Sequence, residues 1–443
     1  MKFTKMSLVA ALLIGSSAFA IDNVKVSGDA KLYYSTDDAV HNAGGQNASD
    51  SLFNKGNSVG EAALSIGLTA DLTKNVSAGF KGTVITTLGL YNNLVSSTWT
   101  GGTEDTYVVD EAWLATTMGK TTVKLGRMPL DTPLVFTETW SLVENTFEAA
   151  VVVNQDLPDT TLVGAYVGQH DSAAVLGGGI AQANSPFVSF FDGAYTVGII
   201  NNSIKPVTVQ AWYYGAQTSI DVQTFLSDLA FAGVELSHLD AIWLQADGNV
   251  EGIKLGAQYT KNDYDLKNAG VGSVDNDAFA LMAGYEMKDI ATFKLAYSQT
   301  GTEKVAGLGA GMNLATLADG NGVAGQPKSK LYTEAWWNYG YVTQADTKTW
   351  TVSAKASVAD IDLGAYYTDA DQGNNGTAGA TGDDMKEFTL TAGKDFGPLN
   401  ATVAYIYTKA DDQNEKAKDG TYFNTDHKGK AFNTVQAYLT LNF

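Results

Sequence analysis

Seven lysines stand at alternate positions of segments whose intervening residues are mainly apolar, and they are the side chains with the clearest chemical potential in this sequence. They are Lys25, Lys31, Lys81, Lys124, Lys254, Lys294 and Lys355. An ammonium group is a fixed positive charge, and several of them around one space would hold a field that attracts anions. The alternative for any one of them is an ordinary solvated lysine. Their repeated placement on the polar side favours a common basic belt.

Arg127 is the only arginine, and it comes just before residues 129–146, which we expect to be a loop. The acids of that loop are Asp131, Glu138 and Glu144. With Lys124 and Arg127 on the facing side, they would create a transverse field across a narrow aqueous space. Alternation puts Arg127 on the apolar side, so a bulge at Gly126 or the end of the strand must turn it inward. Otherwise Arg127 would pair with Asp131 and fix the loop.

Catalytic and metal-binding residues are scarce. The sequence has no cysteine, which excludes disulfides, thiolate zinc sites and cysteine nucleophiles. A hydrolase built on a sheet would need a Ser/His dyad on a strand, but the four histidines fall in predicted loops: His41, His170, His238 and His427. Asp369 and Asp371 faintly resemble a calcium loop, yet the spaced glutamate is missing and a solvated loop is the preferred interpretation. We therefore expect no enzyme activity, no cofactor and no metal.

Length and composition limit the fold classes. The 443 residues include 28 Lys and Arg against 48 Asp and Glu, a formal net charge of -20. This charge argues against a nucleic-acid partner, because phosphates require a basic surface. A bundle of membrane helices would need repeated apolar runs of about 20 residues, and one run alone approaches that length. Aromatic residues make up 11% of the chain, which excludes an acidic disordered protein.

The single long apolar run lies at the N-terminus and is typical of an export signal. Lys2 and Lys5 form its basic start, residues 8–14 its apolar centre, and Ala18-Phe19-Ala20 the small-residue pattern that signal peptidase accepts. This centre is too short to cross about 30 Å of hydrocarbon. We therefore expect residues 1–20 to be a signal peptide and residues 21–443 to be a single exported domain.

From Val24 onward the dominant period is two, which is typical of strands with one apolar face. Residues 24–34 alternate in this way, as do residues 62–72 and 76–80. Further segments of this kind begin near residues 207, 253, 291, 352 and 399. A long helical period is not found. The sequence therefore predicts an all-β fold.

The connections between these segments alternate between short and long. Short turns are expected near residues 73–75, 119–120, 155–159, 201–206, 248–249, 289–290, 359–360 and 397–398. Long connections are expected near residues 36–58, 87–106, 129–146, 170–190, 216–240, 261–277, 300–347, 369–385 and 409–430. These eight turns and nine loops predict about 18 strands. They also place Tyr332–Val342 inside a long connection rather than in a strand of its own.

Sorted connections favour a closed antiparallel barrel in a membrane over a soluble sandwich, whose loops need not divide into a short end and a long end. In hydrocarbon every backbone group needs an internal partner, and a closed barrel provides one. A lysine facing lipid at the midplane would cost about 2–4 kcal/mol, so the lysine belt should line the lumen. Aromatic residues near strand ends would form interfacial girdles: Tyr33, Tyr34, Trp113, Tyr213, Tyr214, Tyr366, Tyr367 and Tyr407.

The final strand is the most specific element. Apolar and polar residues alternate through residues 434–442, and the chain ends with Phe443. This ending resembles the last strand of Gram-negative outer-membrane porins. The segments Asp110–Leu114, Val123–Arg127 and Asp131–Leu134 resemble those of the Opr (OprD-like) and Campylobacter-type major outer-membrane porins. The similarity covers the whole architecture but few diagnostic residues.

This resemblance implies an 18-stranded barrel in the outer membrane of a Gram-negative bacterium, surrounded by outer-membrane lipid and commonly assembled as a homotrimer. It also implies that the third extracellular loop, residues 129–146, folds inward and forms the constriction. Phe443 would be the signal that the barrel assembly machinery reads. The relatives often place several arginines at the constriction, and the single Arg127 here leaves the substrate open.

Together these features predict a general diffusion porin, through which ions and small hydrophilic solutes pass passively. Acids in the long connections, such as Asp37, Asp38, Asp263 and Asp265, would make the outer entrance negative. This field favours mild cation selectivity, although the lysine belt opposes it. The alternative function is that of a secreted β-sandwich adhesin or surface structural protein, which would stay in aqueous solution without detergent.

Overall fold

The structure is a computed structural model. It describes residues 22–39, 51–101, 105–171, 187–221, 235–267, 273–302, 328–373, 382–411 and 429–443. The predicted signal peptide, residues 1–20, lies outside these ranges, as do His41 and His427. No helix within the described ranges has the length and apolar character needed to cross a membrane.

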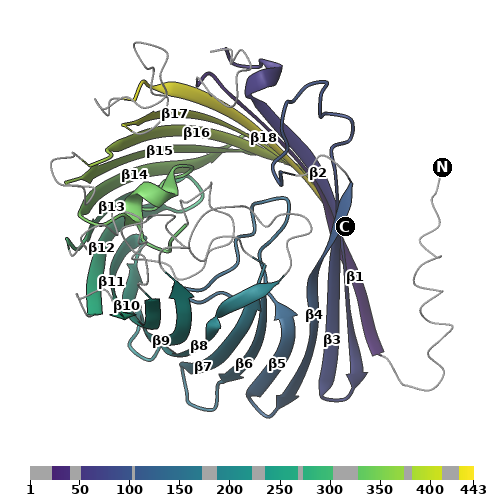
Figure 1. The fold of residues 1–443 in the computed structure, drawn as a ribbon, viewed down its shortest axis with the longest axis vertical. Helices are drawn as coiled ribbons and strands as arrows, with labels where there is room; N and C mark the ends of the chain where they lie inside the picture. The colour runs from purple at the N-terminus through teal and green to yellow at the C-terminus, as the bar shows by residue number, and fades with distance from the viewer. Residues whose placement is uncertain are drawn as a thin grey trace.

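The described strands form one antiparallel sheet that closes on itself (Figure 1). They are β1 (Asp22–Asp37), β2 (Ser58–Thr73), β3 (Val76–Thr86), β4 (Thr106–Met118), β5 (Thr121–Met128), β6 (Phe147–Asn154), β7 (Thr160–His170), β8 (Val188–Asn201), β9 (Val207–Asp221), β10 (Glu235–Val250), β11 (Ile253–Lys267), β12 (Ser273–Met287), β13 (Ala291–Thr300), β14 (Thr347–Val358), β15 (Ile361–Gln372), β16 (Met385–Phe396), β17 (Leu399–Ala410) and β18 (Phe432–Asn442). Because β1 pairs with both β2 and β18, this 18-stranded sheet has no free edge. The predicted all-β closed barrel is confirmed, and the sandwich alternative is wrong because a single continuous sheet contains every one of these strands.

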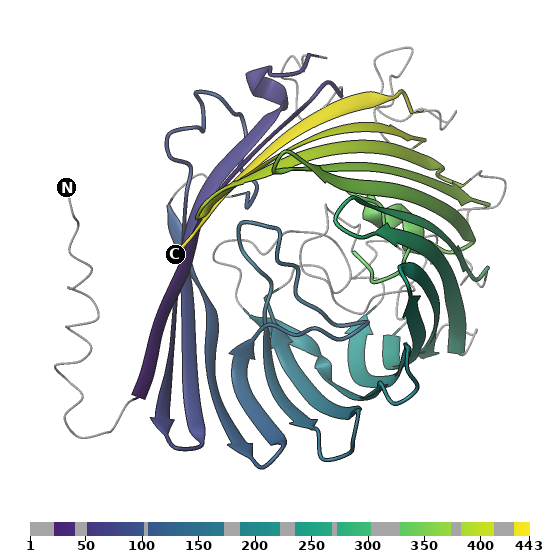
Figure 2. The same cartoon turned by 180° about the vertical axis from the view of Figure 1, so that it is seen from behind.

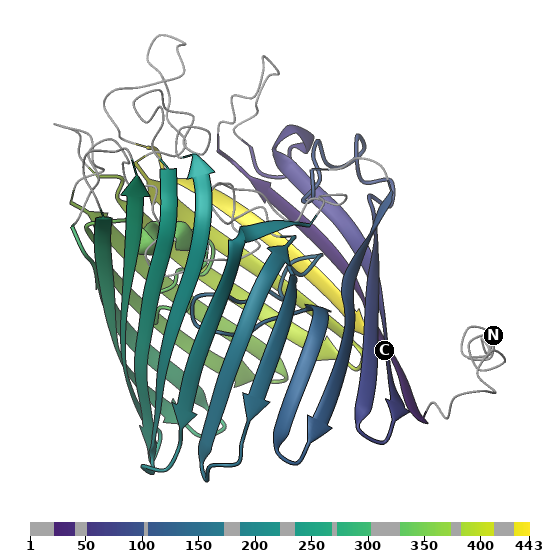
Figure 3. The same cartoon turned by 60° about the horizontal axis from the view of Figure 1, so that its bottom comes forward.

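Short turns gather at one end of the barrel and long connections at the other (Figure 3). The turn between β10 and β11 is residues 251–252 rather than 248–249, because β10 continues to Val250. Tyr332–Val342 lies in the long connection between β13 and β14, as predicted, and runs into the short helix η3 (Tyr339–Thr343). His170 and His238 lie in β7 and β10 and not in loops, because these strands extend further than the sequence predicts.

Burial alternates along the strands. In β12 the side chain of Ala280 is buried, whereas Leu281 is 52% exposed on the outer face. In β14 Thr351 is buried and Val352 is 50% exposed. Successive side chains of a strand point to opposite faces of the sheet. Along the middle of the strands the outer face is therefore apolar, and polar or charged residues such as Ser353 and Lys294 point into the lumen.

The predicted aromatic girdles are half right. Tyr34, Tyr213, Tyr367 and Tyr407 take outward positions, whereas Tyr33, Trp113, Tyr214 and Tyr366 take inward positions. Adjacent residues of a strand point to opposite faces, so each of the pairs Tyr33–Tyr34, Tyr213–Tyr214 and Tyr366–Tyr367 can give one ring to a girdle. The inward rings instead pack inside the barrel.

β1 and β18 close the barrel, and Phe443 lies on their seam. The backbone N–H of Gly28 donates to the carbonyl oxygen of Phe443 at 2.9 Å, and the N–H of Phe443 donates back to Gly28 at 3.0 Å. A Cβ atom at Gly28 would lie 2.5 Å from both the Phe443 ring and the carbonyl oxygen of Ser65. The terminal aromatic ring therefore needs a glycine beneath it. Reading of Phe443 by the assembly machinery stays a prediction.

Gly28→Val should destabilise this seam by roughly 1–3 kcal/mol, because the added side chain must displace both the ring and the backbone. The measurement is the urea concentration at which the folded barrel unfolds. Gly164→Val is the matched control, since Gly164 also lies in a strand and a Cβ there meets nothing within 4 Å. Equal loss of stability in the two variants would contradict the role given to the seam.

Candidate functional site

Two long connections enter the barrel: residues 129–146 after β5, and residues 328–346 before β14 (Figures 1 and 2). They contact each other directly. The Lys328 ammonium lies 2.7 Å from Glu138, and Lys330 pairs with Asp131. These ion pairs join the two segments across the lumen.

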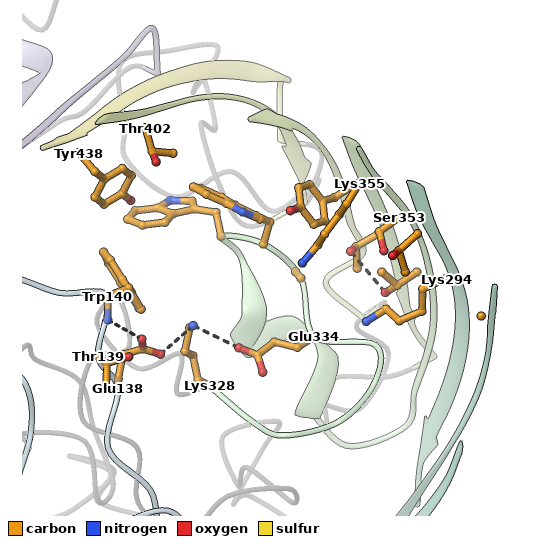
Figure 4. Close-up of a pocket in the computed structure, with 18 of the residues that line it drawn as sticks. Glu138, Thr139, Trp140, Lys294, Lys328, Glu334, Ser353, Lys355, Thr402 and Tyr438 are labelled. Carbon is orange, nitrogen blue, oxygen red and sulfur yellow. Dashed lines mark hydrogen bonds and ion pairs between the residues drawn. The ribbon is translucent and has the colours of Figure 1, made fainter. Parts of the chain in front are cut away.

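A cavity of about 1020 Å³ remains between these segments and the barrel wall (Figure 4). Strands β1, β11 to β15, β17 and β18 contribute to its lining. Its charged lining residues are Asp29, Lys31, Glu138, Glu144, Lys254, Lys294, Lys328, Glu334 and Lys355. The cavity is therefore a polar compartment inside an outwardly apolar cylinder.

One wall of the cavity carries three of the predicted belt lysines. Lys254 pairs with Glu286 at 2.6 Å. The Lys294 ammonium donates to the carbonyl oxygen of Tyr332 at 2.8 Å, and the Lys355 ammonium lies 5.6 Å from the centre of the Tyr366 ring. Lys294 and Lys355 have no carboxylate within ion-pair distance in the described part of the chain, and Figure 4 shows both side chains at the cavity. This wall thus presents two positive charges to a solute.

The opposite side is acidic but largely neutralised. Lys328 lies between Glu138 and Glu334, 3.5 Å from the latter (Figure 4). Enclosure among the two segments raises the pKa of Glu334 to about 7, and the nearby charge of Lys328 limits that rise. Burial disfavours the charged form of a carboxyl group, so Glu334 exchanges its proton near neutral pH.

Two further belt lysines hold residues 129–146 in place. Lys81 lies 3.0 Å from Glu144, and Lys31 lies 3.7 Å from the same carboxylate. The Lys31 ammonium also donates to the carbonyl oxygen of Ser141 at 3.0 Å. Both lysines thus neutralise Glu144, which the sequence assigns to an acidic wall. Their main role is therefore to hold the loop in position.

Aromatic rings fill the lumen beside β1 and β18. Trp99, Trp140 and Trp337 come from three different long connections and pack against one another. Trp99 and Trp140 also contact Tyr33 of β1, and Trp140 contacts Tyr438 of β18. Neighbouring ring centres are 5.0 to 6.5 Å apart, the range of favourable aromatic contacts. This aromatic cluster closes one side of the lumen and leaves the cavity beside it.

Buried carboxylates of the barrel anchor the connections that enter it. Glu387 of β16 accepts hydrogen bonds from the backbone N–H groups of Trp336 at 2.9 Å and Asn338 at 2.7 Å. Glu61 of β2 accepts from the N–H of Thr100 at 2.9 Å and from its hydroxyl at 2.8 Å. Both carboxylates are only 1% exposed. Each therefore satisfies loop N–H groups that water cannot reach.

Arg127 takes a different place from the one the sequence assigns. Its guanidinium donates to Glu148 at 2.8 Å and to the carbonyl oxygen of Val109 at 2.8 Å, and it packs on the ring of Phe187. Arg127 does not line the cavity described above. Gly126 takes a φ of +117° without a register shift in the pairing of β5 with β4, so the suggested bulge is not there. The alternative pairing with Asp131 is also wrong, since Asp131 pairs with Lys330.

The remaining predicted residues lie outside the cavity. Lys25 is exposed on β1, and the Lys124 ammonium lies 4.1 Å from the centre of the Trp113 ring. Asp369 and Asp371 belong to β15 and not to a loop, and Asp369 pairs with Lys386 at 3.2 Å. Among the described residues, no three His, Asp or Glu side chains gather as metal ligands would.

Sequence reasoning missed most of what shapes the cavity. Lys328, Glu334 and Glu387 were not singled out, and neither was the aromatic cluster. One signal was present: the doublet Trp336–Trp337 lies in a predicted loop, where large aromatic residues need a packing partner.

No protein-family model and no curated protein matches this sequence. Several solved structures do match its fold. OccAB1 from Acinetobacter baumannii aligns with a TM-score of 0.66 at 11% identity, over 97% of this chain and 99% of that one. OpdK from Pseudomonas aeruginosa, solved with vanillate, aligns with a TM-score of 0.64 at 14% identity, over 95% and 99%. OccK8 (OprE) from the same organism gives 0.64 at 15% identity, over 96% and 100%.

The fold is that of the OprD/Occ channels. The resemblance to OprD-like proteins that the sequence indicates is therefore confirmed at the level of the 18-stranded barrel. At these identities the agreement concerns the path of the chain, and the function of this barrel must be argued from its own residues.

Glu387→Ala should release residues 328–346 from the wall, because each buried N–H group that loses its acceptor costs about 1–3 kcal/mol. The measurement is the rate of trypsin cleavage after Lys328 and Lys330 in the folded barrel, which we expect to rise. Asp395→Ala is the control, since Asp395 is an exposed carboxylate at the other end of the same strand. Unchanged cleavage in Glu387→Ala would show that this carboxylate is not the anchor.

Proposed function

We propose that this protein is an outer-membrane channel of a Gram-negative bacterium, through which ions and small hydrophilic solutes diffuse passively. The observation that carries the proposal is a closed barrel with an apolar outer face around a charged cavity. A membrane is the environment in which such a face is stable. The confirmed fold class agrees with this function, and no covalent step, cofactor or enzyme activity belongs to it.

The cavity also suggests which solutes interact with it. Among the described residues Lys294 and Lys355 have no carboxylate partner, so the carboxylate of a solute would meet two ammonium groups on one wall. The structure of OpdK with vanillate offers an example of an organic anion in a barrel of this fold. For small inorganic ions we retain mild cation selectivity, because the whole chain carries a net charge of -20. Homotrimer assembly is likewise part of the proposal.

Planar-bilayer recording tests the channel. The purified protein should give stepwise conductance, and Ser353→Trp should lower each step by roughly half, because the new ring would project into the aqueous space. Val352→Trp is the matched control, since the adjacent residue points outward and is 50% exposed. Folded protein that gives no steps would refute the channel, and an equal effect of both variants would refute the cavity as its passage.

Reversal potentials in a salt gradient test the lysine wall. The double variant Lys294→Gln and Lys355→Gln should shift the ratio of cation to anion permeability about twofold toward cations, because two fixed positive charges leave the passage. The control is Lys74→Gln with Lys205→Gln, which removes the same charge from turns at the short end of the barrel. A shift as large in the control would mean that net charge, and not the wall, sets selectivity.

A further inference from the structure

The outer face of β13 to β17 is hollowed by small residues. A groove of about 600 Å³ lies there, and its lining is almost entirely apolar. Alanines form much of its floor: Ala354, Ala356, Ala365 and Ala392. Larger side chains such as Leu363 and Leu390 border it. The groove is therefore apolar and hollow enough to bind a hydrocarbon chain.

A row of aromatic rings follows on the same strands, toward the end with the long connections. It consists of Trp350, Tyr367, Phe388 and Tyr407, which are 51%, 39%, 38% and 38% exposed. Three of these rings are directly opposite one another on neighbouring strands: Tyr367 pairs with Phe388, and Phe388 pairs with Tyr407. Aromatic rings at this position are typical of the boundary between hydrocarbon and headgroups.

Two exposed lysines lie two residues beyond the rings, nearer to the long connections. Lys386 and Lys409 are directly opposite each other in the pairing of β16 with β17, and both point outward. Like charges in directly opposite positions destabilise a sheet unless an anion lies between them. Asp369 pairs with Lys386 at 3.2 Å, whereas Lys409 has no carboxylate at ion-pair distance in the described part of the chain. The pair thus retains a positive charge that a phosphate would balance.

The spacing of these features matches a single amphipathic molecule. Leu390 at the groove and Lys386 are four residues apart on β16, which corresponds to about 13 Å along the strand. An apolar chain in the groove would therefore end in a headgroup at the lysines, after passing the row of rings.

We propose that the outer face of β14 to β17 binds one phosphorylated lipid of the outer leaflet. Its phosphate lies between Lys386 and Lys409, and one acyl chain lies in the groove over Ala365 and Ala392. This inference rests on the proposed location in the outer membrane, since the lysines lie at the end with the long connections. It concerns the lipid-facing surface and is independent of what passes through the lumen.

Native mass spectrometry of the full barrel in detergent, titrated with bisphosphorylated lipid A, tests this site. We expect one tightly bound lipid, with the double variant Lys386→Gln and Lys409→Gln binding it about tenfold more weakly. Ala392→Phe should also weaken binding, because it fills the groove while leaving both lysines in place. Lys74→Gln with Lys205→Gln is the charge-matched control and should bind as the unmodified protein does.

Three results would overturn the proposal: equal lipid affinity in the lysine variant and the control, equal affinity for dephosphorylated lipid A, or displacement of the lipid by inorganic phosphate alone. Loss of an oligomer, without loss of lipid, in Ala392→Phe would assign the groove to a second copy of this chain.

Bilayer recordings of the same preparations distinguish the lipid-binding proposal from the channel proposal. The lysine variant should conduct normally, and failure of the unmodified barrel to conduct would refute the channel regardless of lipid binding.

Discussion

Closure of the backbone hydrogen-bond network between β1 and β18 is the constraint on which the rest of this structure depends. Once every strand has two neighbours, each side chain points either outward to the lipid or inward to the lumen. A shift of one residue in the pairing of a strand would move all its side chains to the opposite face. The apolar outer face and the charged lumen are thus two consequences of one register. The seam at Gly28 and Phe443 matters because it is where the two ends of the chain must find that register together.

A closed cylinder of this size does not by itself make a selective compartment, because its lumen is wide. The long connections reduce that space, and they carry backbone N–H groups into a region partly closed to water. Glu61 and Glu387, which belong to strands of the barrel, accept hydrogen bonds from these loop N–H groups. Asp171, directly after β7, accepts from the N–H of Thr146 at 2.6 Å. Burial raises the pKa of Asp171 to about 6, against the effect of the hydrogen bonds from Thr146. The shape of the cavity therefore depends on polar contacts at the wall as much as on the aromatic cluster.

The sequence predicted the barrel well and the cavity poorly, for a physical reason. Strand positions follow from a local period of two, and alternation of short and long connections counted the strands correctly, including the assignment of Tyr332–Val342 to a loop. The cavity is built from contacts between residues far apart in sequence. Lys328 meets Glu138, and Glu387 meets Asn338, and no local pattern relates such pairs. The inward lysines Lys294 and Lys355 were found because their position depends on period alone.

Arg127 shows how the rarity of a residue can mislead. The sequence predicts a role at the constriction for Arg127 because it is the only arginine. Its guanidinium instead donates hydrogen bonds to Glu148 and the Val109 carbonyl and packs on the Phe187 ring. A guanidinium offers several donors in one plane and suits such a multiple contact. An ammonium on a flexible stem suits a cavity wall better, because it can follow a moving solute without a fixed geometry. A wall of lysines with a structural arginine elsewhere is therefore consistent with passage rather than with tight, oriented binding.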